Sequence, residues 1–209
     1  MRALLRLTAL ALSTLGGLCA LEACSTFEPA TTATAIERQP YHEYISIGGR
    51  FSVSYLHEGK PHSAQGRFQW RQRGDDVDID LLSPLGQTLA RIRVTPFIAM
   101  LERPGQQTQS ATNASELTEQ LLGWAMPADG LRYWLQGFAP AATGTGTSPH
   151  PAAPQTARDD FRAGDWQVRY VSWQPGVNGS HPRRIDLARA SLSSGDLAMR
   201  LVIDAWEPR

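Results

Sequence analysis

Catalysis requires acidic, basic or nucleophilic side chains at defined spacings, and the candidates in this sequence lack such spacings. Asp76, Asp78 and Asp80 form the densest acidic group, but on a strand all three share one solvated face because they alternate with apolar residues. The 5 histidines are scattered, without the spacing of metal ligands. The G-x-S-x-G, H-E-x-x-H and phosphate-loop motifs are absent. We therefore expect no catalytic residue, no metal site and no cofactor, and we predict that the chain is not an enzyme.

Covalent lipid attachment is the chemistry that the sequence does favour, at Cys24. Arg2 and Arg6 precede a long apolar stretch, which is typical of a secretory signal, with a retained membrane-spanning helix as the rival interpretation. The run Leu21-Glu22-Ala23-Cys24 resembles the lipobox of bacterial lipoproteins, whose cysteine is acylated and becomes the new N-terminus, although Glu22 departs from the usual small or apolar residue. Several acyl chains, at about 0.8 kcal/mol for each buried methylene, hold a protein on a membrane. We predict lipidation of Cys24, and an ordinary cleaved signal followed by an unmodified cysteine is the alternative.

The composition predicts one folded domain behind a targeting segment. Residues 1–23 are predicted to be the lipoprotein signal peptide, residues 24–43 the acylated N-terminus and a flexible tether, and residues 44–209 the domain, with a low-complexity surface loop at 139–157. Ser25 resembles the second residue of lipoproteins sent to the outer membrane, where the chain would face the periplasm. The 20 basic and 20 acidic residues give zero net charge, which disfavours nucleic acid as a partner. No run of basic residues is present to hold anionic lipid, so we expect membrane contact to be mainly hydrophobic.

Period-two alternation of apolar and polar residues predicts a mainly β protein. From Tyr44 onward we expect about nine to eleven half-buried antiparallel strands, one of them with Phe97 on its apolar face. A pair of short helices interrupts the strands, the first capped by Ser115 and the second over residues 128–136. Many short antiparallel strands favour a barrel or a strongly curled sheet, whose inner face can enclose a cavity beneath the helices. The clearest strand segments are 68–70, 77–81, 90–94, 97–101, 166–173, 184–189 and 197–206.

A turn between two of these strands places an apolar side chain where water is expected. The turn is Ser83-Pro84-Leu85-Gly86-Gln87, in which Pro84 and Gly86 reverse the chain and Leu85 occupies the tip. Local chemistry leaves two interpretations open. Leu85 either folds back onto the core or is a lone exposed residue without a role, or it projects as a wedge that touches a membrane or a ligand.

Eight short motifs occur in an order that is specific, although each is weak alone. They are Gly49–Val53, Gly66–Trp70, Asp80–Thr88, Leu121–Pro127, Leu131–Gly137, Trp166–Tyr170, Pro182–Ile185 and Leu201–Trp206. Together they resemble the LolB family of outer-membrane lipoprotein receptors over roughly Ile47 to Trp206. Glu22 and the insert at 139–157 depart from the family pattern, but neither lies in the motifs that would carry function.

The resemblance implies a fold and a role. The implied fold is a half-open antiparallel β-barrel of the LolA/LolB type with a small helical lid over a hydrophobic cavity. The implied role is to accept acylated lipoproteins from a soluble periplasmic carrier similar to LolA and to insert them into outer-membrane lipid, without a nucleotide. In that family the leucine of the Pro-Leu-Gly loop enters the membrane, which corresponds to Leu85 between Pro84 and Gly86. We expect the chain to be a monomer.

Apolar residues of the predicted inner face are the candidates for the wall of an acyl-chain cavity, and plain core packing is the alternative for each of them. Two other classes of function stay open: a structural or assembly lipoprotein that binds a protein or cell-wall partner, and a periplasmic hydrolase with an unrecognised site. The cavity candidates are Phe51, Phe68, Trp70, Ile79, Leu81, Ile92, Leu121, Trp134, Val168, Leu201 and Ile203.

Overall fold

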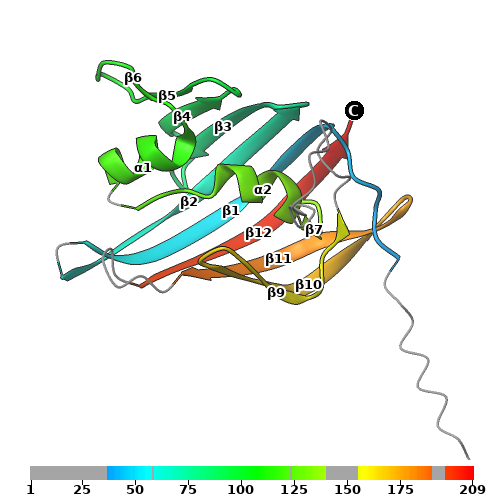
Figure 1. Cartoon of the computed structure of the whole chain (residues 1–209). Coiled ribbons are helices and arrows are strands. Elements are labelled where there is room, and N and C mark those ends of the chain that lie inside the picture. The colour runs from blue at the N-terminus through cyan, green and yellow to red at the C-terminus, as the bar shows by residue number, and fades with distance from the viewer. Residues whose placement is uncertain (1–36, 58, 123, 140–154, 190–195) are drawn as a thin grey trace, which may run out of the picture. The chain divides into compact units, whose positions relative to one another are not determined.

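One antiparallel sheet of ten strands dominates the computed structural model, which describes residues 37–57, 59–122, 124–139, 155–189 and 196–209 (Figure 1). The order along this sheet is β6-β5-β4-β3-β2-β1-β12-β11-β10-β9, so the first and last long strands pair in its middle and the sheet stays open between β6 and β9. Figure 1 shows both helices on one face of the curved sheet. The mainly β, half-open antiparallel barrel with a helical lid is thus confirmed. The ten strands of the main sheet fall within the predicted nine to eleven, and β7 and β8 form a further two-stranded sheet. The elements are β1 (Tyr44–His57), β2 (Lys60–Arg73), β3 (Asp76–Leu82), β4 (Thr88–Val94), β5 (Ala99–Glu102), β6 (Gln109–Ala111), α1 (Ala114–Leu122), α2 (Ala128–Trp134), β7 (Phe138–Ala139), β8 (Gln155–Thr156), β9 (Asp160–Ala163), β10 (Trp166–Gly176), β11 (Gly179–Arg189) and β12 (Leu197–Pro208).

Apolar residues at alternate positions form continuous rows across the inner face of the sheet. One row runs over five neighbouring strands through Ile47, Trp70, Ile79, Ile92 and Leu101, each paired in register with the next. All five side chains are buried. Burial of a large apolar side chain contributes about 1.5–3 kcal/mol, so such rows supply the main stabilisation of the sheet and explain why its polar residues face outward.

A β-bulge lets the central strands approach closely. The register of β1 against β12 shifts between Gly48 and Gly49. A Cβ atom on Gly49 would lie 2.2 Å from the carbonyl oxygen of Val202 and 2.8 Å from the ring of Phe68, so only glycine fits there. Bulges bend a strand and increase its twist, which curls the sheet towards the helices.

Phe97 is not on the inner face, so this prediction is wrong. Its side chain is 86 % exposed in the turn before β5, which begins only at Ala99. The backbone N–H of Thr95 donates to the carbonyl oxygen of Ile98 at 3.0 Å and closes the turn. The alternation that includes Phe97 therefore begins before the strand itself does.

The N-cap of α1 also differs from the prediction. Asn113 caps the helix, because its Oδ1 accepts a hydrogen bond from the backbone N–H of Glu116 at 2.9 Å. Ser115, the predicted cap, lies inside the helix, and its hydroxyl donates to the carbonyl oxygen of Met126. Asparagine and serine are about equally good caps, so local propensity does not discriminate between the two positions.

The C-terminal end of the predicted tether and both ends of the predicted loop take part in the folded domain. Residues 37–43, which the sequence analysis assigned to the tether, contact β11 through a bridge between Arg38 and Ser180. The ends of the predicted loop pair as the two-stranded sheet of β7 and β8, and its central residues, 140–154, lie outside the described residues. Within the described part of the chain, no helix has the length and apolar character needed to cross a membrane.

Candidate functional site

A small apolar cavity lies between the inner face of the sheet and the helices. Its volume is about 60 Å³, and every residue of its wall is apolar. Concave apolar sites of this kind bind apolar ligands because they remove hydrocarbon from water. The sheet contributes Phe51, Phe68, Trp70, Ile79, Leu81, Ile92, Met199 and Leu201 to the wall, and the helical side contributes Trp124, Met126, Leu131 and Leu135.

The cavity is small and partly open in this structure. A volume of about 60 Å³ holds only a few groups of the size of water, which is far too little for a long fatty acyl chain. An acyl chain can enter only if one side of the wall moves. The sheet is held by hydrogen-bonded strands, so the helical side is the part that can be displaced.

Seven of the residues predicted to line an acyl cavity lie in this wall: Phe51, Phe68, Trp70, Ile79, Leu81, Ile92 and Leu201. The other four pack into the surrounding core instead: Leu121, Trp134, Val168 and Ile203. Alternation identifies the inner face but not the stretch of each strand that the cavity occupies. The sequence analysis missed five wall residues, of which Trp124 and Met126 lie between the helices, where no periodicity marks them: Trp124, Met126, Leu131, Leu135 and Met199.

Helix α2 is fixed to the sheet through its last turn, at two points. The guanidinium of Arg132 donates to the carbonyl oxygens of Gly74 and Asp75 and pairs with the Asp75 carboxylate at 3.1 Å. The hydroxyl of Tyr170 donates to the carbonyl oxygen of Trp134 at 3.0 Å. Burial raises the pKa of Tyr170 far above its usual value, so the hydroxyl keeps the proton that this hydrogen bond needs.

An N-terminal strap, defined as residues 37–43, adds further attachments to the end of α2. The buried amide of Gln136 accepts a hydrogen bond from the backbone N–H of His42 at 2.8 Å and donates to the carbonyl oxygen of the same residue at 3.0 Å. The guanidinium of Arg38 donates to the carbonyl oxygen of Gly137 at 3.2 Å. The segment that joins the domain to the predicted tether is therefore bonded directly to this end of the lid.

Helix α1 is attached differently, because its polar side-chain bonds stay within the lid. The hydroxyl of Thr118 accepts a hydrogen bond from the backbone N–H of Met126 at 2.7 Å, and the hydroxyl of Ser115 donates to the carbonyl oxygen of Met126 at 3.0 Å. Its packing partners in the sheet are the short strands β5 and β6. These bonds connect α1 with Met126, a wall residue of the cavity.

The turn that carries Leu85 is closed by backbone hydrogen bonds and exposes its tip. Within it, the backbone N–H of Ser83 donates to the carbonyl oxygen of Gln87 at 2.8 Å, and the N–H of Gly86 donates to that of Ser83 at 2.9 Å. Gly86 has a φ of +87°, which side-chain-bearing residues rarely adopt. Leu85 is 91 % exposed and does not fold back onto the core. An apolar side chain held in water by a stiff turn is suited to entering an apolar phase.

Two further expectations concern lipid attachment and metal binding. Cys24 lies outside the described residues. Among the residues that the structure describes, no three His, Cys, Asp or Glu side chains come together in a way that would hold a metal ion.

Comparison with known proteins identifies the family. A family model described as "Outer membrane lipoprotein LolB" matches residues 43–206. The chain belongs to the LolB family. Relatives named outer-membrane lipoprotein LolB include one from Cupriavidus necator, 39 % identical over 95 % of this chain and 97 % of the relative, and one from Ralstonia nicotianae, 36 % identical over 91 % and 93 %. A solved LolA superfamily protein from Nitrosomonas europaea covers 82 % of this chain and 88 % of its own at 13 % identity, and its TM-score of 0.47 is too low to carry an argument.

Membership of the LolB family confirms several predictions together. The chain is an outer-membrane lipoprotein anchored by lipid, as the resemblance implied, and it is not an enzyme. The matched residues include the cavity wall, the lid and the Leu85 turn.

Proposed function

We propose that this LolB-family protein accepts acylated lipoproteins from a soluble periplasmic carrier and inserts them into the outer membrane without a nucleotide. The observation that carries the proposal is the wholly apolar cavity beneath a lid whose polar bonds to the sheet, among the described residues, come from its α2 side. Acyl chains in water are costly, at about 0.8 kcal/mol for each methylene that must be buried, so a receptor needs such a shelter during transfer.

Opening of the lid follows from the bonding pattern described above. We expect α1 and the segment 124–126 to move away from the sheet, because their polar bonds stay within the lid. Helix α2 stays in place because Arg132, Tyr170 and the N-terminal strap hold it. The displaced wall then includes Trp124 and Met126, so their departure enlarges the 60 Å³ cavity along its length.

Release into the membrane requires an apolar contact with the bilayer. Leu85, between Pro84 and Gly86, supplies it from a turn that cannot collapse. The direction of transfer follows from affinity alone: the receptor cavity must bind the acyl chains more tightly than the carrier does, and the bilayer must hold them more tightly still.

The test uses the soluble form of residues 25–209, which contains every described element. A fluorescent apolar probe is expected to enter the cavity and to be displaced by a triacylated lipopeptide, and a lipoprotein bound to the carrier is expected to move onto the soluble domain. An assembly lipoprotein without an acyl site would take up no probe. Failure of both uptake and transfer would refute the proposal.

A further inference from the structure

Arginines outnumber aspartates on the outer face of the sheet, although the whole chain has a net charge of zero. Four aspartates of this face each pair with two or three arginines, nine arginines in all. This surplus is not apparent in the sequence, because the arginines lie on six different strands. The pairs are Asp78 with Arg73 and Arg93, Asp80 with Arg71 and Arg91, Asp186 with Arg169, Arg184 and Arg200, and Asp204 with Arg50 and Arg183.

The largest surplus surrounds Asp186. This carboxylate is 18 % exposed and lies between Arg184 at 2.7 Å, Arg200 at 3.3 Å and Arg169 at 3.7 Å. Arg200 and Arg169 are 54 % and 61 % exposed, so the positive charges reach solvent while the negative charge lies beneath them. Partial burial alone would raise the pKa of Asp186, but hydrogen bonds from Arg184 and Arg200 lower it below its usual value and keep the group ionised. One carboxylate cannot neutralise three guanidinium groups.

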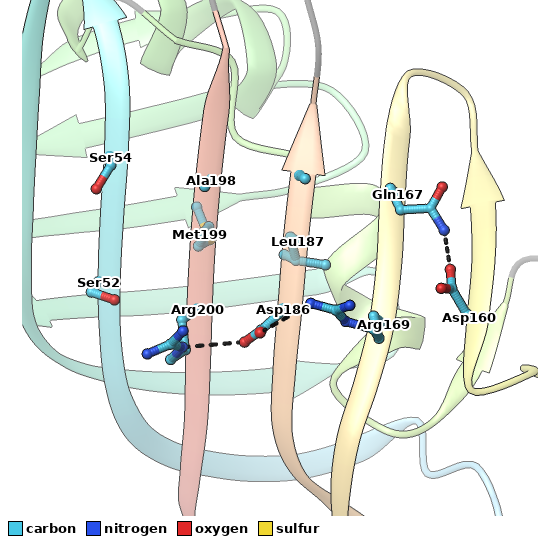
Figure 2. Close-up of a pocket in the computed structure, with 11 residues that line it drawn as sticks. Ser52, Ser54, Asp160, Gln167, Arg169, Asp186, Leu187, Ala198, Met199 and Arg200 are labelled. Atoms are coloured by element: carbon cyan, nitrogen blue, oxygen red, sulfur yellow. Dashed lines mark hydrogen bonds and ion pairs between the residues drawn. The ribbon is translucent and has the colours of Figure 1, made fainter.

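Arg169 and Arg200 line an open groove across β1, β12, β11, β10 and β9. Its volume is about 560 Å³, and Ser52, Ser54, Ala188 and Ala198 contribute small side chains to its lining. Figure 2 shows Arg200 and Arg169 on either side of Asp186, in a row over three neighbouring strands. At the far edge, Gln167 donates a hydrogen bond to Asp160, the other carboxylate of the groove.

We propose that this groove binds the phosphate groups of anionic membrane lipids and holds the domain against the bilayer. Guanidinium groups bind phosphate through paired, charge-assisted hydrogen bonds, and Arg169 and Arg200 are free to turn their outer N–H groups to a ligand. The proposal adds an electrostatic contact to the mainly hydrophobic one expected from the sequence, because folding gathers arginines that are dispersed in the sequence.

The position of the lipid anchor favours a bilayer as the occupant. The protein is an outer-membrane lipoprotein, and its N-terminal strap bonds to β11, one of the strands of the groove, through Gln39 and Ser180. The predicted anchor at Cys24 precedes Glu37 by 13 residues. A chain of that length spans at most about 45 Å, so the groove stays within reach of lipid headgroups.

The experiment measures binding of soluble residues 25–209 to vesicles of phosphatidylcholine with and without phosphatidylglycerol. Wild-type protein is expected to sediment only with the anionic vesicles and to be released by salt. Arg169→Gln with Arg200→Gln is expected to weaken binding roughly 30-fold, at about fivefold for each arginine near an anionic surface. Arg184 still pairs with Asp186 in this variant, which preserves the fold. Asp160→Asn is expected to strengthen binding.

The matched control is Arg103→Gln with Arg209→Gln, which removes the same charge outside the groove and is expected to bind within about twofold of wild type. Equal weakening by both double variants, or equal binding to both kinds of vesicle, would overturn the proposal. Inorganic phosphate added at constant ionic strength separates the sources: displacement from vesicles at low millimolar concentration would mean that the groove is a site for free phosphate instead. Uptake of the apolar probe should be unchanged in the groove variant. A failure of the lipid-binding proposal can therefore be distinguished from a failure of the proposed transfer function.

Discussion

The clamp between the N-terminal strap and helix α2 can be tested with Gln136→Ala. The side chain of Gln136 is 1 % exposed and makes three hydrogen bonds, two with the backbone of His42 and one with the carbonyl oxygen of Arg132. Alanine removes all three and leaves the N–H and the carbonyl oxygen of His42 without these partners. The strap would then lose its central attachment to the lid.

The expected cost follows from the two backbone groups left unpaired. A buried group that loses its hydrogen-bond partner costs about 1–3 kcal/mol, and His42 is only half-buried, so water recovers part of this loss. We expect the free energy of unfolding to fall by about 3 kcal/mol. For a domain of this size that lowers Tm by roughly 6–12 °C.

Urea and thermal denaturation of residues 25–209, followed by circular dichroism, measure this change. The matched control is Gln120→Ala, because Gln120 lies on the exposed side of α1 and makes one weak hydrogen bond with Glu116 at 3.3 Å. The control is expected to lose less than about 0.5 kcal/mol. If Gln136→Ala were as mild as Gln120→Ala, the strap would not hold the lid, and the proposed opening on the α1 side would lose its physical basis.

Three further predictions concern the membrane and pH. Leu85→Glu should leave probe uptake intact but lower delivery of lipoprotein into liposomes at least tenfold, since a charge replaces the apolar tip; Val177→Glu, at another fully exposed turn, should not, and equal delivery by both variants would remove the wedge role. Cys24→Ala in the full chain should move the protein from membrane pellets to the soluble fraction, and continued pelleting would indicate an uncleaved helix. Burial lowers the pKa of His42 and of His181, so the unfolded chain binds more protons than the folded one below about pH 6.5. The free energy of unfolding should therefore fall as the pH drops from 7.5 to 5. Denaturation midpoints that do not change over this range would contradict the lowered pKa of the two histidines.

Particular residues show which structural features the alternation of apolar and polar residues predicts. The row from Ile47 to Leu101 follows from alternation alone, because side chains two apart on a strand must share a face. The same rule fails at Phe97, because this residue lies in the turn before β5 and not on the strand that alternation predicts. It also cannot separate Ile79, in the cavity wall, from Ile203, in solid core, because both occupy the inner face and differ only in what the lid covers.

The order of local motifs by itself determined that this is a lipid-anchored, mainly β protein of the LolB type, and placed Leu85 at the tip of a turn. These properties depend on neighbouring residues, such as the lipobox-like run that ends at Cys24 and the alternation within each strand. Only the tertiary structure decided that the cavity is small, that the N-terminal strap is bonded to Gln136 at the end of the lid, and that three arginines surround Asp186. Each of these arrangements joins residues that lie far apart in the chain, and their distances are set by strand pairing and packing, which no local pattern encodes.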